Sequence, residues 1–341
     1  MSFENIRLEK GMYRQSGKSF TQVLEGLDPS ENYHGTALEG TDAFQRQLKR
    51  FGIHAKGANS DTVEKFFSTA DSAVLFPEFI SRVVRQGMDE ADILSQLCAT
   101  VTNIDAMDYR SIYSVPTEAD KELMDVGEGA TLPAAVIRTR DHLVQLKKRG
   151  RLLTASYEAL RFQKLDLFSV MLRQMGASIQ KTLLKDAVTV LLDGDGNDND
   201  ATVYTLGQSP LTGPSGTLTY AQLVEFWGEF RPFEMNTLIM DSTMTVSLLQ
   251  LPEMQNPAAG LNFQGTGKLV TPLGAQILRT DAMEPDTILA IDRRYALEMV
   301  QAGDVSVEFD KLIDRQMELA AITSICGFSK ICNEATAALV L

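Results

Sequence analysis

The sequence has few of the residues and runs that mark secreted, membrane or disulfide-bonded proteins. Its three cysteines, Cys98, Cys326 and Cys332, form no CxxC pair. Such a sparse, odd set fits a reducing compartment and buried thiols better than a disulfide framework. No apolar run approaches the roughly eighteen residues that a membrane-spanning helix needs. The N-terminal stretch MSFENIRLEKG also lacks the apolar core of a signal peptide. We therefore expect a protein of the cytoplasm, or of something assembled there.

The sequence also lacks the motifs that carry most catalysis. No stretch fits GxGxxG or GxSxG. The segment from Gly265 to Lys268 resembles a phosphate-binding loop, but the earlier glycine is missing and Leu269 replaces the required Ser or Thr. The three histidines, His34, His54 and His142, stand in no metal-ligand spacing. We expect no catalytic residue, no cofactor and no metal, and hence a protein that is not an enzyme.

One acidic loop, DGDGNDND at 193–200, partly matches a calcium-binding loop. Asp193, Asp195 and Asn197 occupy the first three ligand positions. The match ends where Asp198 replaces the required glycine and Tyr204 replaces the final glutamate. A solvated turn is the favoured interpretation, and a calcium-dependent enzyme is kept as an alternative.

Composition indicates a folded, acidic protein of about two domains. The chain has 341 residues, of which 44% are hydrophobic and 23% charged, so it can bury a sizeable core. Its net charge of −13 argues against tight binding of nucleic acid, because such a surface repels phosphates.

The longest predicted element is a helix over Asp166–Leu192. Apolar residues recur there at three- and four-residue steps and form one stripe: Phe168, Leu172, Met175, Ile179, Leu183, Ala187 and Val190. Asp166 is a suitable N-cap, and Gly194 follows the helix end. The helix would be roughly 40 Å long, enough to support several layers of a fold.

Residues 105–150 are predicted to form a long two-stranded excursion with an acidic tip and a basic root. Extended segments flank a turn-rich stretch around Gly127 and Gly129. We expect contacts between neighbouring subunits from eight charged residues in this region: Glu118, Asp120, Glu122 and Glu128 at the tip, and Lys147, Lys148, Arg149 and Arg151 at the root. The basic run could also be read as a nucleic-acid patch, but no aromatic residues interleave with it.

The remaining segments are predicted to form further helices and strands. Residues 1–70 are polar and rich in glycine, and we expect an extended arm with helical pieces over 42–51 and 62–67. Later helices are predicted over 78–86, 156–161, 219–230 and 242–249, the third with a capping box of Thr219 and Gln222. Predicted strands lie at 236–241, 273–278, 287–292, 296–301, 305–310 and 316–324, and 251–267 is read as a loop.

The order of these elements resembles the HK97-type major capsid protein of tailed bacteriophages. The resemblance covers about residues 70–341 and rests on several segments in sequence. AVLFPEFISRVV resembles the exit from an N-terminal arm, and DVGEGATLPAAVIRTRDHLVQLKKRGRLLTASYEAL resembles the extended loop and its return. TLIMDSTMTVSLLQL resembles the strand and helix of an axial domain, and DTILAIDRRYALEMVQAGDVSVEFD the late strands.

The resemblance implies an α+β, HK97-like capsid fold with a defined layout. It comprises an N-terminal arm (1–70), a peripheral-domain entry (71–104), an extended loop (105–150), a peripheral domain with the spine helix 166–192 (151–207), an axial domain (208–300), and a peripheral-domain C-terminal strand and tail (301–341). It implies a major capsid protein whose copies form hexamers and pentamers of an icosahedral shell around packaged double-stranded DNA. Scaffold, portal and decoration proteins are further partners that it implies. The expected location is the virion capsid, assembled in the host cytoplasm, with no membrane partner.

Two other interpretations of the chain remain beside the calcium-dependent enzyme. An encapsulin-type nanocompartment shell has the same fold, although the arm of about 70 residues favours a phage protein. A capsid-independent adaptor or tail component is disfavoured by the spine helix and the axial-domain segments.

Overall fold

A computed structural model of the protein describes residues 3–14, 18–106, 108–114, 125, 128, 137–156, 162–255, 269–303, 305–312 and 317–341. The chain divides into two compact units. The first unit comprises Met1–Asp92, Lys148–Gln180 and Asp304–Ser324, and the second comprises Ile93–Lys147, Lys181–Gly303 and Ile325–Leu341. No helix within the described ranges is both long and apolar enough to cross a membrane.

The first unit begins with short helical elements that precede one longer helix. The α-helices are α1 (Phe20–Leu27), α2 (Ala43–Arg50), α3 (Ala70–Ala73) and α4 (Phe76–Glu90). Short 3-10 helices lie at Phe3–Asn5, Lys10–Arg14, Ser30–Tyr33 and Val63–Phe67. Local sequence explains several starts, because Ser19 with Gln22 and Asp42 with Gln45 form capping boxes at α1 and α2.

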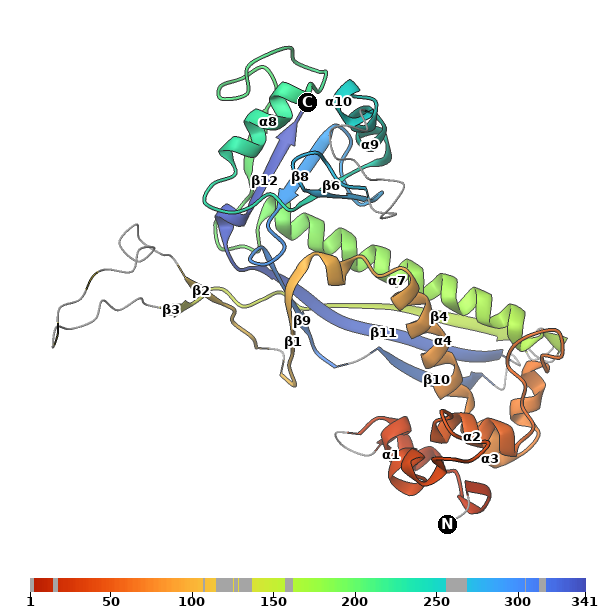
Figure 1. Ribbon diagram of the computed structural model, residues 1–341. Helices are drawn as coiled ribbons and strands as arrows, with labels where there is room; N and C mark the ends of the chain where they lie inside the picture. The colour runs from red at the N-terminus through yellow and green to blue at the C-terminus, as the bar shows by residue number, and fades with distance from the viewer. Residues whose placement is uncertain are drawn as a thin grey trace. The chain divides into compact units, whose positions relative to one another are not determined.

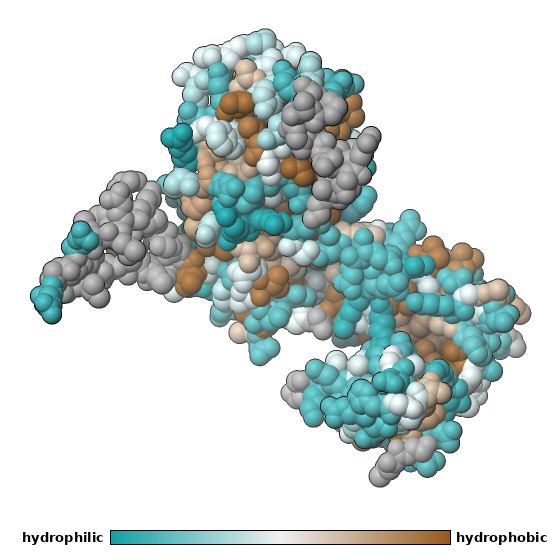
Figure 2. Space-filling view, in the orientation of Figure 1, coloured by the Kyte–Doolittle hydropathy of each residue, from teal (hydrophilic) through white to brown (hydrophobic). Residues whose placement is uncertain are grey.

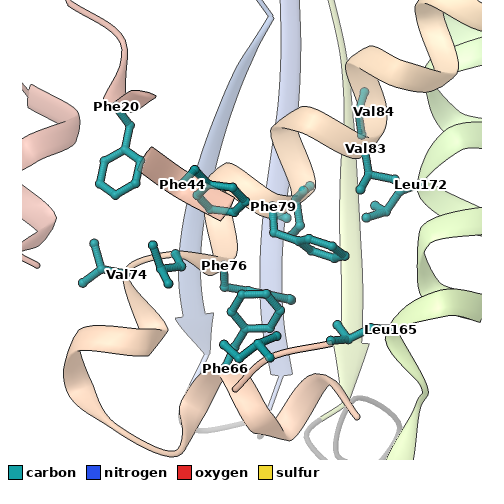
Figure 3. Close-up of a cluster of buried hydrophobic side chains, with 14 of the residues drawn as sticks. Phe20, Phe44, Phe66, Val74, Phe76, Phe79, Val83, Val84, Leu165 and Leu172 are labelled. Atoms are coloured by element: carbon teal, nitrogen blue, oxygen red, sulfur yellow. The ribbon is translucent and has the colours of Figure 1, made fainter. Parts of the chain in front are cut away.

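The expectation of an extended N-terminal arm is wrong for most of residues 3–67. Apolar side chains from this region, such as Leu24, Phe44 and Phe66, are buried and join one core with α4. Figure 3 shows the aromatic rings of Phe66, Phe76 and Phe79 packed together, with ring centroids of Phe66 and Phe79 5.2 Å apart. The many glycines of the region interrupt its helices without preventing its burial, because the short pieces still present apolar faces.

A buried arginine organises the N-terminal region. Arg46 of α2 is fully buried and donates from Nε to Asp28 Oδ2 at 2.6 Å and from Nη2 to the Asp28 carbonyl at 2.6 Å. Its guanidinium also lies 4.3 Å from the ring centroid of Tyr33, whose hydroxyl donates to Asp28 Oδ1 at 2.6 Å. Since a buried charge is stable only when it is paired and hydrogen-bonded, this arrangement fixes the fold of the region.

A second arginine joins this region to α4. Arg82 donates to Asp42 at 2.5 Å, to Glu78 at 2.8 Å and to the hydroxyl of Thr21 at 2.8 Å. Its guanidinium lies 4.3 Å from the ring centroid of Phe44. One side chain of α4 thus holds both α1 and α2 in place.

The predicted long helix is present as α7 (Leu165–Asp193), one residue longer at each end than expected. Its residues up to Gln180 belong to the first unit and those from Lys181 to the second. Leu172, Leu183 and Ala187 of the predicted stripe are buried. Gln180, which lies off that stripe, is also buried and donates to Asp92 at 2.6 Å.

In the first unit α4 and α7 cross with their backbones in contact. A Cβ atom on Gly176 of α7 would collide with the carbonyl oxygen of Val84, and one on Gly87 of α4 would collide with the carbonyl oxygen of Arg173. Both helices pack on one core with strand residues such as Ala320 and Ile322. The single internal glycine of the long helix is therefore the point at which the second helix approaches.

Strand β11 (Met317–Lys330) also runs through both units. In the first unit it pairs antiparallel with β10 (Ser306–Leu312) and also pairs with β4 (Lys147–Ser156). In the second unit Cys326–Lys330 pair antiparallel with β9 (Leu297–Gln301), which pairs in parallel with β1 (Cys98–Asn103). Figure 1 shows β11 as the longest strand of the chain. The predicted strand 316–324 is thus only the first part of β11.

The second unit contains a five-stranded sheet in the order β5-β12-β8-β6-β7. Its strands are β5 (Thr202–Thr205), β6 (Thr237–Met240), β7 (Gln276–Arg279), β8 (Thr287–Ile291) and β12 (Thr336–Val340). All residues of β6 and β8 are buried, which is typical of central strands covered on both faces. The helices are α8 (Tyr220–Glu229), α9 (Ser242–Leu249) and α10 (Pro252–Gln255).

The helix predictions in this unit are confirmed, and the interpretation of the C-terminus changes. α8 has the expected capping box of Thr219 and Gln222, and α9 has the expected bounds. The C-terminal residues were expected to form a peripheral strand and tail. They instead include β12, which pairs antiparallel with β8 and parallel with β5. Small apolar residues such as Ala337 and Ala338 suit a central strand that is buried between neighbours. The predicted helix 156–161 lies largely outside the described residues.

We expect Gly176→Ala to destabilise the chain by about 1–3 kcal/mol, because the added methyl group meets backbone atoms that cannot move independently. Gly26→Ala is the matched control, since Gly26 lies in α1 with open space around its missing Cβ. The control should stabilise the protein by about 0.5–1 kcal/mol. Urea unfolding followed by circular dichroism measures both, and equal midpoints for Gly176→Ala and wild type would contradict the close helix crossing.

Candidate assembly surfaces

The root of the predicted excursion is an antiparallel pair of strands in the second unit. β2 (Ile112–Ser114) pairs with β3 (Ile137–Thr139), so that Ile112 faces Thr139 and Ser114 faces Ile137 (Figure 1). Of the predicted tip residues, Glu118, Asp120 and Glu122 lie outside the described residues. Glu128 is exposed in a turn. The predicted two-stranded character is confirmed at the root.

A buried carboxylate fixes the direction of this root. Glu298 of β9 is 4% exposed and accepts hydrogen bonds from three hydroxyl groups: Thr102 at 2.6 Å, Tyr109 at 2.7 Å and Ser111. All three donors precede or begin the excursion. Burial, together with the hydrogen bond to Glu298, raises the pKa of the Tyr109 hydroxyl, so it remains a donor at neutral pH.

Arg140 holds the returning strand at the same root. Its backbone N–H donates to the carbonyl of Ser111 at 2.9 Å, which continues the pairing of β2 and β3. Its Nη2 donates to the carbonyls of Lys330 at 2.5 Å and Ile331 at 3.2 Å. The local sequence gives no sign of this role, because its partner Lys330 lies 190 residues away in the chain.

Hydrogen bonds of the acidic loop hold the ends of α7 and β11 together. Asp195 accepts from the Ser329 hydroxyl at 2.9 Å, from the backbone N–H of Lys330 at 3.0 Å and from Asn197 Nδ2 at 2.8 Å. Burial alone would raise the pKa of Asp195, but these hydrogen bonds outweigh it and hold the pKa below its usual range. The loop is therefore a structural joint rather than the solvated turn that we expected.

Lys330 completes this joint from β11. Its side chain is fully buried, and Nζ donates to the carbonyls of Leu191 at 3.1 Å and Asn199 at 2.6 Å. Burial lowers the pKa of Lys330 to about 8. Leu191 lies in the last turn of α7, where carbonyl groups lack helical partners and favour a cationic donor.

The four basic residues that the sequence predicts for subunit contacts, Lys147, Lys148, Arg149 and Arg151, lie along β4. Lys147 Nζ is 3.2 Å from Asp186 Oδ1, so this lysine already has an acidic partner within the second unit. Lys148 and Arg151 are exposed, and Arg149 is half-buried. The structure brings these four residues together on one strand. Their pairing with the acidic tip of a neighbouring subunit stays a prediction.

The first unit exposes an apolar face on the early turns of α7. Leu167, Val170 and Met171 are 58%, 48% and 55% exposed and follow one another at helical spacing. Figure 2 shows apolar colour at this end of the helix. Contiguous exposed apolar side chains mark interaction surfaces in folded proteins.

Nothing in the described ranges resembles a metal centre. No group of three or more His, Cys, Asp or Glu side chains there is placed to hold an ion. Asp195, the central candidate of the calcium interpretation, is occupied by the donors described above.

Several solved capsid-type structures share this fold. A virus-like particle protein from Pyrococcus furiosus aligns with a TM-score of 0.50 at 12% identity, over 77% of this chain and 99% of that chain. A structure from Microbacterium phage Oxtober96 gives a TM-score of 0.51 at 12% identity, over 73% and 90%. The capsid of Cyanophage P-SCSP1u gives 0.50 at 13% identity, over 73% and 87%. At these identities the likeness establishes the fold alone.

The fold is therefore that of HK97-type capsid proteins. The model of one protein family, described as phage capsid protein, matches residues 139–312, just over half of the chain. The chain belongs to the phage capsid protein family. No curated protein matches it by sequence. Family membership favours the phage capsid over the nanocompartment shell and over an enzyme.

We expect Glu298→Leu to loosen the root of the excursion, because three hydroxyl donors lose a buried acceptor. The expected loss of stability is about 2–4 kcal/mol. Hydrogen exchange should accelerate at residues 109–114 and 137–144. Glu298→Gln is the control, since it keeps the shape and one acceptor oxygen and should cost about 1 kcal/mol. Unchanged exchange in Glu298→Leu would show that Glu298 does not position the root.

Proposed function

We propose that the protein is the major capsid protein of a tailed phage, and that its copies form hexamers and pentamers of an icosahedral shell around double-stranded DNA. The observation that carries this proposal is the match of the phage capsid family to residues 139–312, on a chain whose fold is that of solved capsids. The role is structural rather than enzymatic. The mature location is the virion capsid, and assembly takes place in the host cytoplasm.

The acidic character of the chain supports a shell that encloses DNA without gripping it. A net charge of −13 repels phosphates on average, so packaged DNA can be released from such a container. Scaffold, portal and decoration proteins are the further partners that this role predicts.

Electron microscopy of the purified protein, expressed alone and with the neighbouring virion genes, tests the function. We expect closed shells or rings of five and six subunits in at least one of these preparations, because heterologous contacts that repeat by rotation close into rings. Monodisperse monomers under both conditions would contradict a capsid role. Uniform shells that package a cellular enzyme instead of DNA would favour the nanocompartment.

The extended loop is proposed to contact a neighbouring subunit through its charges. In this proposal Glu118, Asp120, Glu122 and Glu128 of one copy face the β4 residues of the next. Lys147 and Arg149 have interactions within their own chain. Lys148 and Arg151 are exposed, and they are the residues to test first.

Reversing the tip charges to lysine should reduce the yield of shells, and so should Lys148→Glu with Arg151→Glu. The two sets combined should restore part of the yield, because each copy again offers opposite charges. A single exposed pair contributes only about 0–1 kcal/mol, but a shell repeats it many times. Lys56→Glu with Lys65→Glu is the control for a general change of charge at exposed positions. Normal shell yields for both the tip variant and the β4 variant would refute the proposed charge pairing.

A further inference from the structure

An exposed aromatic hollow lies in the second unit, at the end of α8 and after β8. Its walls include Trp227, Phe233, Arg294 and Tyr295. Trp227, the single tryptophan of the chain, is 44% exposed, and Tyr295 is 47% exposed. We call this feature the Trp227 hollow. Two large aromatic side chains are thus left in water on a surface that belongs to neither the core nor the root of the extended loop.

The Trp227 hollow is preformed by a buried carboxylate. Asp292 is fully buried and accepts from Arg294 Nε at 2.9 Å, from Arg294 Nη2 at 2.8 Å and from Asn236 Nδ2 at 2.7 Å. Arg294 reaches Glu234 at 2.8 Å as well. The rings of Phe233 and Tyr295 are 5.7 Å apart between centroids. A partner that binds here therefore meets side chains that are already ordered, which lowers the entropic cost of binding.

The residue types of the hollow are those that dominate the centres of protein interfaces. Trp, Tyr and Arg are the residues whose truncation most often costs binding energy. Arg231 also lines the hollow, and Arg293 precedes Arg294 in the chain; both are exposed. Neither has a side-chain hydrogen bond or ion pair with any residue in the described part of the chain. The hollow thus offers aromatic surface together with positive charge that has no acidic partner among the described residues.

The complementary surface lies at the opposite end of β8. The turn between β7 and β8 carries Asp281, Glu284 and Asp286, all exposed. Asp281 has one weak partner, Lys181, with Nζ 3.7 Å away and both side chains mostly exposed. β8 separates this acidic turn from the hollow by about 16 Å, at roughly 3.3 Å per strand residue. One subunit cannot join its own two surfaces across that distance.

We propose that the Trp227 hollow of one copy receives the acidic turn 281–286 of a second copy. The contact joins two different surfaces and is therefore heterologous, which is the type of contact that builds rings. The occupant is a second copy because the opposite charges occur on the same chain. This inference rests on the proposed function, and it names a contact that assembly uses.

The single tryptophan reports directly on this contact. Assembled shells and dissociated subunits of the wild-type protein are compared by intrinsic fluorescence. On assembly, the emission of Trp227 should move to shorter wavelength, and its quenching by acrylamide should fall at least about twofold, because interface cores exclude water. Trp227→Phe with Tyr295→Trp is a second reporter in the same hollow and should behave alike.

Charge reversal identifies the occupant. Arg231→Glu with Arg293→Glu should lower the yield of shells about tenfold, as should Asp281→Lys with Glu284→Lys, while the combined variant recovers most of it. These positions are exposed, so the thermal midpoint of the free subunit serves as the control for folding. Asp292 and Arg294 are left intact, because they build the hollow.

The outcomes separate this inference from the capsid role. Closed shells with an unshifted Trp227 emission overturn the inference and leave the capsid role standing. Shifted emission without recovery in the combined variant overturns the assignment of the acidic turn as the occupant. An emission shift that requires an added virion protein overturns the second copy as the partner. Absence of shells in every preparation would count against the capsid role itself.

Discussion

The buried amine of Lys330 joins the longest helix and the longest strand of the described residues. Lys330 lies at the end of β11, and its Nζ donates to Leu191 in the last turn of α7 and to Asn199 in the loop that follows. Asp195 of the same loop accepts a hydrogen bond from the backbone N–H of Lys330. Because the buried cation needs several partners and the half-buried carboxylate accepts several hydrogen bonds, the two elements cannot shift separately at this joint.

The root of the extended loop depends on the same joint. Arg140 donates to the carbonyl of Lys330, and its backbone pairs with Ser111, which also donates to Glu298. The chain entering the excursion and the chain leaving it are thus both held by buried charged groups. An ordered root lowers the entropic cost of any contact that the extended loop is proposed to make with a neighbouring subunit.

The surfaces that we propose for assembly differ in kind from these joints. Lys148 and Arg151 of β4 and the carboxylates of the turn 281–286 are exposed and charged, whereas the Trp227 hollow combines aromatic rings with arginine. Exposed charges contribute little singly but select partners and register, and buried aromatic surface supplies most of the binding energy. In this proposal assembly is distributed over several modest contacts.

Local sequence determined the helices that are marked by apolar spacing and by capping residues. The apolar stripe and the absence of proline predicted α7 within one residue at each end, and Thr219 with Gln222 predicted the start of α8. The order of such elements also carried the capsid resemblance. These features depend on spacing and capping, which neighbouring residues decide by themselves.

Only the tertiary structure decided which polar residues are buried. Arg46, Arg140, Glu298 and Lys330 look like surface residues in the sequence, and the N-terminal 70 residues look like an arm. Their partners come from distant segments, so the compensation that permits burial is invisible to local patterns. For the same reason the place of β12 was not predicted, because no residue near Thr336 indicates that its neighbours in the sheet are β5 and β8.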